Sequence, residues 1–118
     1  MIQLTSHMRI LVATAPVDMR KQIDGLCAIC REVFAVDPLS GVVFVFAGRN
    51  RKMVRLLAYD NQGFWLCTKR LSQGRFSCWP KGDGTNPCSP LLVRELQILI
   101  WGGDPASCTF PDLWRRIA

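Results

Sequence analysis

Two cysteines of the sequence, Cys27 and Cys30, form a C-x-x-C pair, a spacing that serves zinc binding or thiol redox chemistry when it lies on a loop. Here the neighbouring residues follow a helical pattern, in which positions i and i+3 share one face. A zinc site would need two further ligands, and neither a second C-x-x-C pair nor an H-x₃-H pair follows. We therefore interpret both cysteines as small, reduced, apolar side chains, with zinc as the less favoured alternative. No cofactor is expected.

The other groups that could catalyse a reaction do not form an active site. His7 is the single histidine and lies near the N-terminus, in a stretch expected to fray, so no Cys–His or Ser–His relay is expected. A two-metal nuclease needs converging carboxylates. Four carboxylates are instead expected in separate helix caps and turns: Asp18, Asp24, Asp37 and Asp60. Because glycine-rich nucleotide-binding fingerprints are also missing, we expect neither an enzyme nor a small-molecule substrate.

Positive charge is concentrated in one part of the chain. The 118 residues carry a formal net charge of +6, which makes a polyanion the first partner to consider. Residues 49–81 hold eight basic groups and one acidic group, whereas residues 1–48 have no net charge and residues 82–118 have a net charge of −1. The excess therefore belongs to the middle of the chain.

Length and composition indicate one globular domain covering residues 1–118, with a core at about 8–104 and a weakly ordered tail at 105–118. Hydrophobic residues make up 49% of the sequence, enough for a core without disulfides. The longest apolar run, residues 42–47, is far shorter than the roughly 20 residues that span a bilayer, so no membrane partner is expected. The apolar stretch before Ala13 is too short for a signal peptide, and we expect a cytoplasmic protein.

The pattern of residues predicts an α+β fold. Residues 8–14 read as a strand, and apolar positions after Asp18 trace one face of a helix that reaches residue 34. Asp18 is expected to cap this helix or to lie in its first turn. Three strands follow at residues 42–47, 53–59 and 64–71, joined by short turns rich in Gly, Asn and Asp. We therefore expect a small antiparallel sheet, a three-stranded meander plus the N-terminal strand, packed by two helices.

The second helix is expected to start near Ser89 and Pro90, with serine as the N-cap and proline at the first helical position, and to stop at Gly102.

This topology brings distant basic residues together. In an up-down-up meander, the first turn and the end of the third strand lie at the same end of the sheet. Seven basic side chains should converge there and contact DNA phosphates: Arg49, Arg51, Lys52, Arg55, Lys69, Arg70 and Arg75. The alternative is a solvated charged face. Trp65, Phe76 and Trp79 lie nearby in sequence and could stack on bases, although core packing is the favoured role for each.

Several segments of the chain, in order, resemble a known family. They are TAPVDMRKQIDGL at residues 14–26, DPLSGVVFVF at 37–46, GRNRK at 48–52, LLAYDNQGFWL at 56–66 and KRLSQGRFSCWP at 69–80, followed by a leucine-rich helix. Together they resemble the TnpB-type, or Orf2-like, accessory proteins of the insertion-sequence-sixty-six family over residues 8–104. The sequence departs from that pattern at Ala47, at Cys67 and Thr68, and in a tail without a dense Lys/Arg run.

The resemblance implies a small bacterial protein that takes part in transposition beside a separate, larger transposase, which carries the strand-cleaving activity. The leading hypothesis is a non-catalytic factor that binds DNA at the terminal repeats of the mobile element and works with that transposase in DNA recombination. The alternative is an adaptor that binds the transposase and has only incidental DNA affinity. Its candidate surface is the family's helix motif, with Asp18, Arg20 and Lys21.

Overall fold

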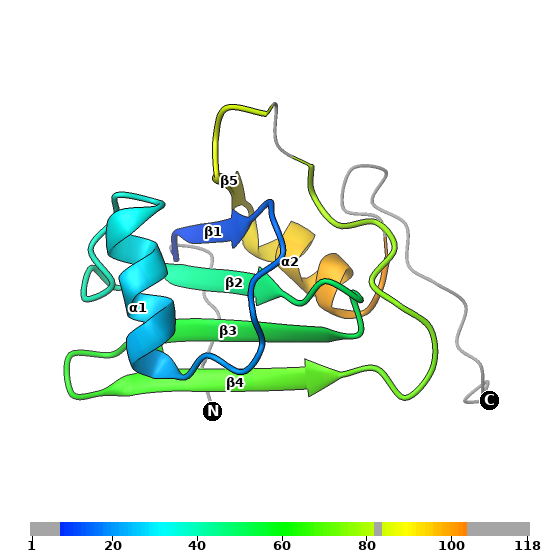
Figure 1. Cartoon of the computed structure of the whole chain (residues 1–118), viewed down its shortest axis with the longest axis horizontal. Coiled ribbons are helices and arrows are strands. Elements are labelled where there is room, and N and C mark those ends of the chain that lie inside the picture. Colours follow the sequence, from blue (N-terminus) through cyan, green and yellow to red (C-terminus); the bar gives the residue numbers. More distant parts are fainter. Residues whose placement is uncertain (1–7, 82–83, 104–118) are drawn as a thin grey trace.

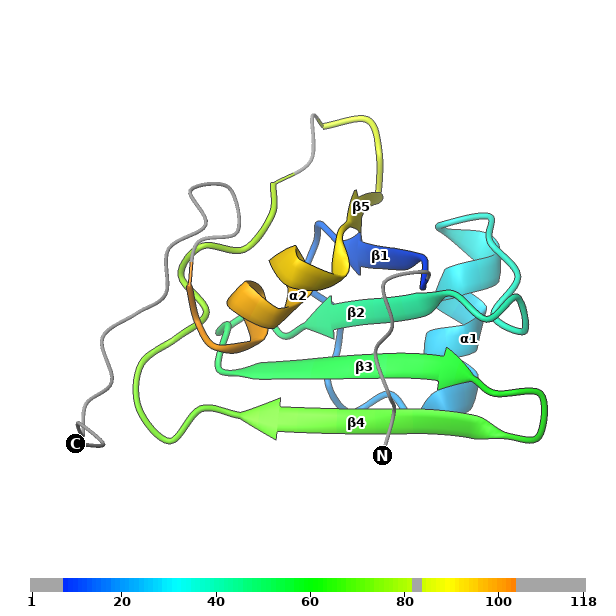
Figure 2. The same ribbon diagram turned by 180° about the vertical axis from the view of Figure 1, so that it is seen from behind.

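The computed structural model describes residues 8–81 and 84–103, which form one five-stranded sheet with a helix on each face (Figures 1 and 2). The strand order is β4-β3-β2-β1-β5. The strands are β1 (Ile10–Ala13), β2 (Val43–Ala47), β3 (Met53–Tyr59), β4 (Phe64–Arg70) and β5 (Cys88–Leu91), and the helices are α1 (Ile23–Glu32) and α2 (Val93–Ile100). The fold is α+β, as the sequence predicts; the expected tail at residues 105–118 and His7 lie outside the described residues.

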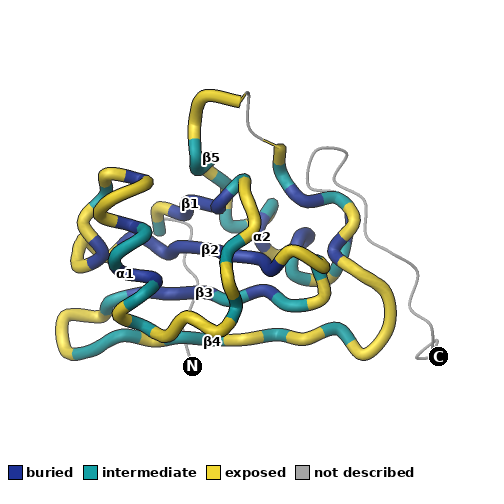
Figure 3. The backbone as a smooth tube through the Cα atoms, in the orientation of Figure 1, coloured by how far each residue is buried: buried dark blue, intermediate teal, exposed yellow. Residues whose placement is uncertain are grey.

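Strand β2 occupies the middle of the sheet and is buried along its whole length, as the dark tube in Figure 3 shows. Its side chains alternate between two cores. Phe44 and Phe46 pack toward α1, against Leu26 and Cys30, whereas Val43 and Val45 belong to the core on the α2 face. A strand buried on both faces needs a run of apolar residues rather than an alternating one, and residues 42–47 supply it.

The meander predicted from the sequence is present: β2 pairs with β3, and β3 with β4, both antiparallel. The N-terminal strand joins it differently from the prediction of an antiparallel sheet. β1 runs parallel to β2, with Ile10 opposite Val43 and Val12 opposite Val45. α1 crosses over between these two strands, which is the connection that a parallel pair requires.

A fifth strand was not predicted. Residues 88–91 form β5, which pairs antiparallel with β1 at the sheet edge, with Pro90 opposite Leu11. The expected helix start near Ser89 and Pro90 is therefore wrong, and α2 begins at Val93. Proline is tolerated here because an edge strand can turn a position without an N–H toward solvent. The capping contact at the start of α2 is made instead by Glu95, whose Oε1 accepts a hydrogen bond from the Leu92 N–H at 2.8 Å.

The first helix also starts later than predicted. α1 begins at Ile23, with Gln22 at the N-cap position, so Asp18 neither caps the helix nor lies in its first turn. Instead, residues 14–22 run across the face of the sheet from β1 to the start of α1 (Figure 1). The Val17 N–H donates to the Ala47 carbonyl oxygen at 2.9 Å, and this bond holds the segment against the end of β2.

The segment after β4, residues 71–80, helps α2 to close the opposite face. Phe76 and Trp79 are buried there together with Leu96 and Leu99, so both aromatics fill the core, as the sequence favours. The Trp79 Nε1–H donates to the Ala13 carbonyl oxygen at 2.8 Å in a buried environment. Trp65, by contrast, is 41% exposed.

Neither helix of the described residues is long and apolar enough to cross a membrane.

The indole bond of Trp79 gives a stability prediction. Trp79→Phe should lower the free energy of unfolding by about 1–3 kcal/mol, because it leaves the buried Ala13 carbonyl unpaired and removes part of a packed ring. Urea denaturation checks this value. The matched control is Trp65→Phe, whose indole bonds to the exposed Asp60 carboxylate. An equal loss in both variants would contradict the structural role assigned to Trp79.

Candidate nucleic-acid interface

The seven basic residues singled out in the sequence lie toward one end of the sheet. The β2–β3 turn carries three of them, and the paired ends of β3 and β4 carry three more, with Met53 opposite Arg70 and Val54 opposite Lys69. Arg75 follows in the loop after β4 (Figure 1, right). They divide into two groups: three are half-buried and held by protein groups, and four are exposed.

The half-buried group is Arg51, Arg55 and Lys69. The Arg51 guanidinium stacks over the Trp79 ring at 5.2 Å, and burial lowers its pKa. Arg55 Nη1 donates to the Lys21 carbonyl oxygen at 2.6 Å. Lys69 Nζ donates to the Ile100 carbonyl oxygen at 2.9 Å, beside the Trp101 ring. Each cation therefore ties the sheet to a segment that covers it: the loop after β4, the segment before α1, or the end of α2.

The exposed group is Arg49, Lys52, Arg70 and Arg75. Among the residues that the structure describes, no carboxylate lies within ion-pair distance of any of them. Lys52 and Arg70 flank an open hollow of about 420 Å³ that is also lined by residues 71–74. The Leu71 N–H donates to the Lys52 carbonyl oxygen at 2.9 Å and extends the β3–β4 ladder up to this hollow. Two cations are thus held at the rim of one cavity.

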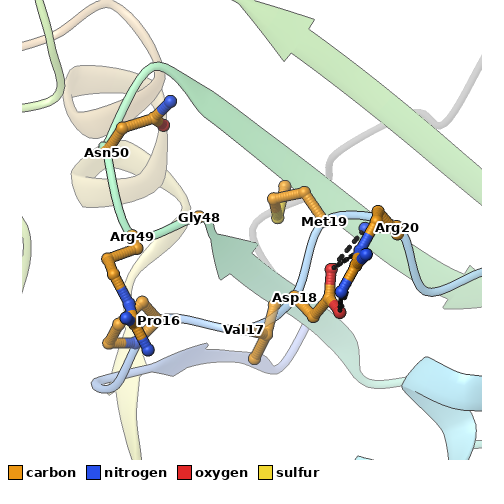
Figure 4. A pocket seen from close by; sticks show the side chains of 8 residues that line it. All are labelled: Pro16, Val17, Asp18, Met19, Arg20, Gly48, Arg49 and Asn50. Carbon is orange, nitrogen blue, oxygen red and sulfur yellow. Dashed lines mark hydrogen bonds and ion pairs between the residues drawn. The ribbon is translucent and has the colours of Figure 1, made fainter.

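A second hollow, of about 560 Å³, lies between the segment before α1 and the β2–β3 turn. Figure 4 shows its lining, in which Arg49 and Pro16 lie on one side of the view and Asp18 and Arg20 lie on the other. Gly48 allows the close approach: a Cβ added there would lie 2.7 Å from Met19 Cγ. The sequence did not reveal that the family motif and the basic turn are neighbours in space.

Asp18 and Arg20 bind each other. The Arg20 guanidinium donates to both carboxylate oxygens of Asp18, with Nη2 to Oδ2 at 2.9 Å, and the Arg20 backbone N–H donates to Oδ1. The side-chain bond from Arg20 is the largest cause that lowers the pKa of Asp18 to about 2. The carboxylate therefore stays ionised at neutral pH and offsets the charge of Arg20. Arg49, which also lines this hollow, has no such partner in the part of the chain that the structure describes.

The C-x-x-C pair lies inside the protein. Cys27 and Cys30 are both buried on the sheet-facing side of α1, in the core that contains Phe44. Burial raises the pKa of both thiols, that of Cys30 to about 12. They are consequently neutral at physiological pH, whereas metal binding and nucleophilic attack need the thiolate. Within residues 8–81 and 84–103, no group of three or more His, Cys, Asp or Glu side chains is arranged to hold a metal ion.

Comparison with known proteins identifies the family. The family model described as "IS66 Orf2 like protein" matches residues 8–109. Two similar proteins come from Sinorhizobium fredii: "Uncharacterized protein y4jC" is 36% identical over 104 residues, which cover 88% of this chain and 86% of that protein. "Uncharacterized protein y4hO" is 38% identical over 84 residues, which cover 71% and 72% of the two chains. No solved structure matches.

The approach of Met19 to Gly48 can be tested by a double-mutant cycle. Gly48→Ala should lower the free energy of unfolding by about 1–3 kcal/mol, because the new methyl group overlaps Met19. Met19→Ala should make the same Gly48→Ala change much less costly, since the space is then free. Chemical denaturation of the four proteins measures the coupling. Additive effects would mean that the two segments do not touch.

Proposed function

This chain belongs to the IS66 Orf2-like family, which is associated with an insertion sequence, and from that premise we propose that it is a non-catalytic accessory protein of DNA transposition. In this proposal, the protein binds DNA through the basic end of its sheet and acts with a separate transposase. The observation that carries the proposal is the group of four exposed cations, Arg49, Lys52, Arg70 and Arg75, none of which has an ion-pair partner within residues 8–81 and 84–103.

Clustered like charges repel one another, and phosphates relieve that repulsion while releasing counterions from DNA. The half-buried group contributes less to DNA binding in this proposal, because its side chains already contact protein groups: Arg51, Arg55 and Lys69. Contacts of the exposed group go to phosphates, which position a protein on DNA but carry no sequence information. The choice of the element's terminal repeats then falls mainly to the transposase.

The salt dependence of DNA binding tests this division. Four phosphate contacts should give a slope of roughly −4 in a plot of log K against log salt, and Lys52→Gln with Arg70→Gln should reduce its magnitude by about 2. Fluorescence anisotropy with terminal-repeat and scrambled DNA measures both. The control is Arg9→Gln with Arg31→Gln, which removes the same charge from exposed positions near the start of β1 and the end of α1, away from the β2–β3 turn.

Equal slopes for the two double variants would mean that the Lys52–Arg70 hollow makes no specific contribution. A slope near zero for the unaltered protein would remove the DNA-binding proposal.

The alternative function, an adaptor that binds the transposase, is favoured by the hollow beside the family motif. Its rim offers an ion pair, an uncompensated arginine and the apolar surface of Pro16 and Val17, a mixture suited to a protein segment. DNA affinity would then be incidental.

Co-purification with the element's transposase after nuclease treatment tests the adaptor. Arg20→Glu with Lys21→Glu should abolish co-purification if the motif is the docking surface, since both side chains are exposed and the changes reverse their charge. The matched comparison is Lys52→Gln with Arg70→Gln, which should leave co-purification intact. If the second pair of changes abolished it and the first did not, the docking surface would lie at the sheet end instead.

A further inference from the structure

Strand β4 lies at the edge of the sheet and has an open side. β3 pairs with its inner side along all seven residues, Phe64–Arg70, and no strand of the described residues pairs with the outer side. Such an edge offers a row of backbone N–H and C=O groups to another strand. It is the longest strand edge left unpaired in the part of the chain that the structure describes.

The ladder determines which residues present those groups. The Leu71 N–H bonds to the Lys52 carbonyl, and the Asp60 N–H to the Gly63 carbonyl. Because hydrogen-bonded and non-hydrogen-bonded pairs alternate along an antiparallel ladder, every second residue of β4 is bonded inward to β3: Trp65, Cys67 and Lys69. The remaining residues direct their backbone groups to the open side: Phe64, Leu66, Thr68 and Arg70.

The side chains of β4 are complementary to those of the same strand reversed. Two aromatic residues, Phe64 and Trp65, occupy one end, two cations, Lys69 and Arg70, occupy the other, and Cys67 stands at the centre. We propose that β4 pairs antiparallel with β4 of a second copy of this chain, about a two-fold axis at Cys67. Trp65 then faces the second copy's Lys69, and Phe64 faces its Arg70.

This register is the one that satisfies both the backbone and the side chains. Hydrogen bonds between the copies then join all four outward-directed residues, with Leu66 opposite Thr68 and Phe64 opposite Arg70. The same register places cations beside aromatic rings, which attract them. A two-fold axis at Leu66 or Thr68 keeps the backbone pattern but puts Cys67 opposite Trp65 or Lys69. An axis near the cationic end would bring like charges face to face.

Exposed tryptophans support the same partner. Trp65 is 41% exposed and Trp101 is 58% exposed. Trp101 lies 4.8 Å from Lys69 Nζ, the cation that faces Trp65 of the second copy in this register. Pairing would therefore remove two large apolar surfaces from water at one place. It would also leave the two basic ends at opposite ends of the joined strands.

Sedimentation equilibrium of the full, DNA-free chain tests the association. Because the contact is the pairing of one seven-residue strand, we expect a weak dimer of twice 13.3 kDa, with a dissociation constant of about 1–100 μM. Thr68→Pro should raise that constant at least about tenfold, because it removes an outward N–H and no bond to β3. Thr68→Val is the matched control and should leave it unchanged. Circular dichroism should show both variants folded.

The position of the axis is tested by oxidation with diamide. Two Cys67 thiols lose two protons and two electrons to diamide and form a disulfide between the copies, since residues at a non-hydrogen-bonded pair are about 4.5 Å apart between Cα atoms. Cys67→Ser should abolish the cross-linked dimer, and Cys78→Ser should not. A monomer at every concentration, an unweakened Thr68→Pro dimer, or cross-linking that survives Cys67→Ser would each overturn the proposal.

Discussion

The burial of β2 on both faces is the constraint on which the rest of the structure depends. All five of its residues are fully buried, so two covers are required, one on each side of the sheet. The first cover is α1, which lies between β1 and β2 in the sequence. Because the helix connects these two paired strands, they run parallel. The second cover is formed by α2 and the loop after β4, which carries Phe76 and Trp79 into the core. With both faces occupied, the basic residues of the meander lie toward the end of the sheet where Met53 pairs with Arg70.

Three of the seven basic residues have a structural role in the fold. Arg51, Arg55 and Lys69 each join the sheet to one of its covers, through a ring or a backbone carbonyl. Arg51 Nη1 and Arg55 Nε are buried and have no hydrogen-bond partner within the described residues, so holding these cations in place costs some of the stability that their contacts supply. A basic cluster counted from the sequence therefore overstates the charge offered to a polyanion. Four of the seven residues are left exposed, and their arrangement is set by how the other three anchor the fold.

Local signals predicted the meander, including its strand at residues 42–47, and the presence of both helices, because turn residues and apolar periodicity act over short distances. β3 even has the predicted bounds. Failures arose where distant segments decide. Ser89 followed by Pro90 is a typical helix start. Here the two residues pair with β1 instead, because proline at an edge strand costs no hydrogen bond. Asp18 is a residue type that often caps a helix. Here its carboxylate binds Arg20, and the Ala47 carbonyl accepts a hydrogen bond that holds the segment before the helix against β2. For the candidate site, topology predicted the common end of the basic residues, but not which of them Trp79, Lys21 or Ile100 would engage.

The proximity of the family motif and the basic turn changes how the two functional hypotheses relate. Met19 lies under Gly48, and the neighbouring Arg49 faces the same hollow as Asp18 and Arg20. A partner segment that fills this hollow would touch Arg49, and DNA bound at Arg49 would approach the motif. The two surfaces are therefore contiguous, and a partner bound at one would alter the electrostatic environment of the other. Because Asp18 offsets only one of the two arginines, the hollow keeps a net positive character. An acidic segment of a protein and a phosphate group would then compete for Arg49, while the Lys52–Arg70 hollow, which shares no lining residue with this one, would stay available to DNA.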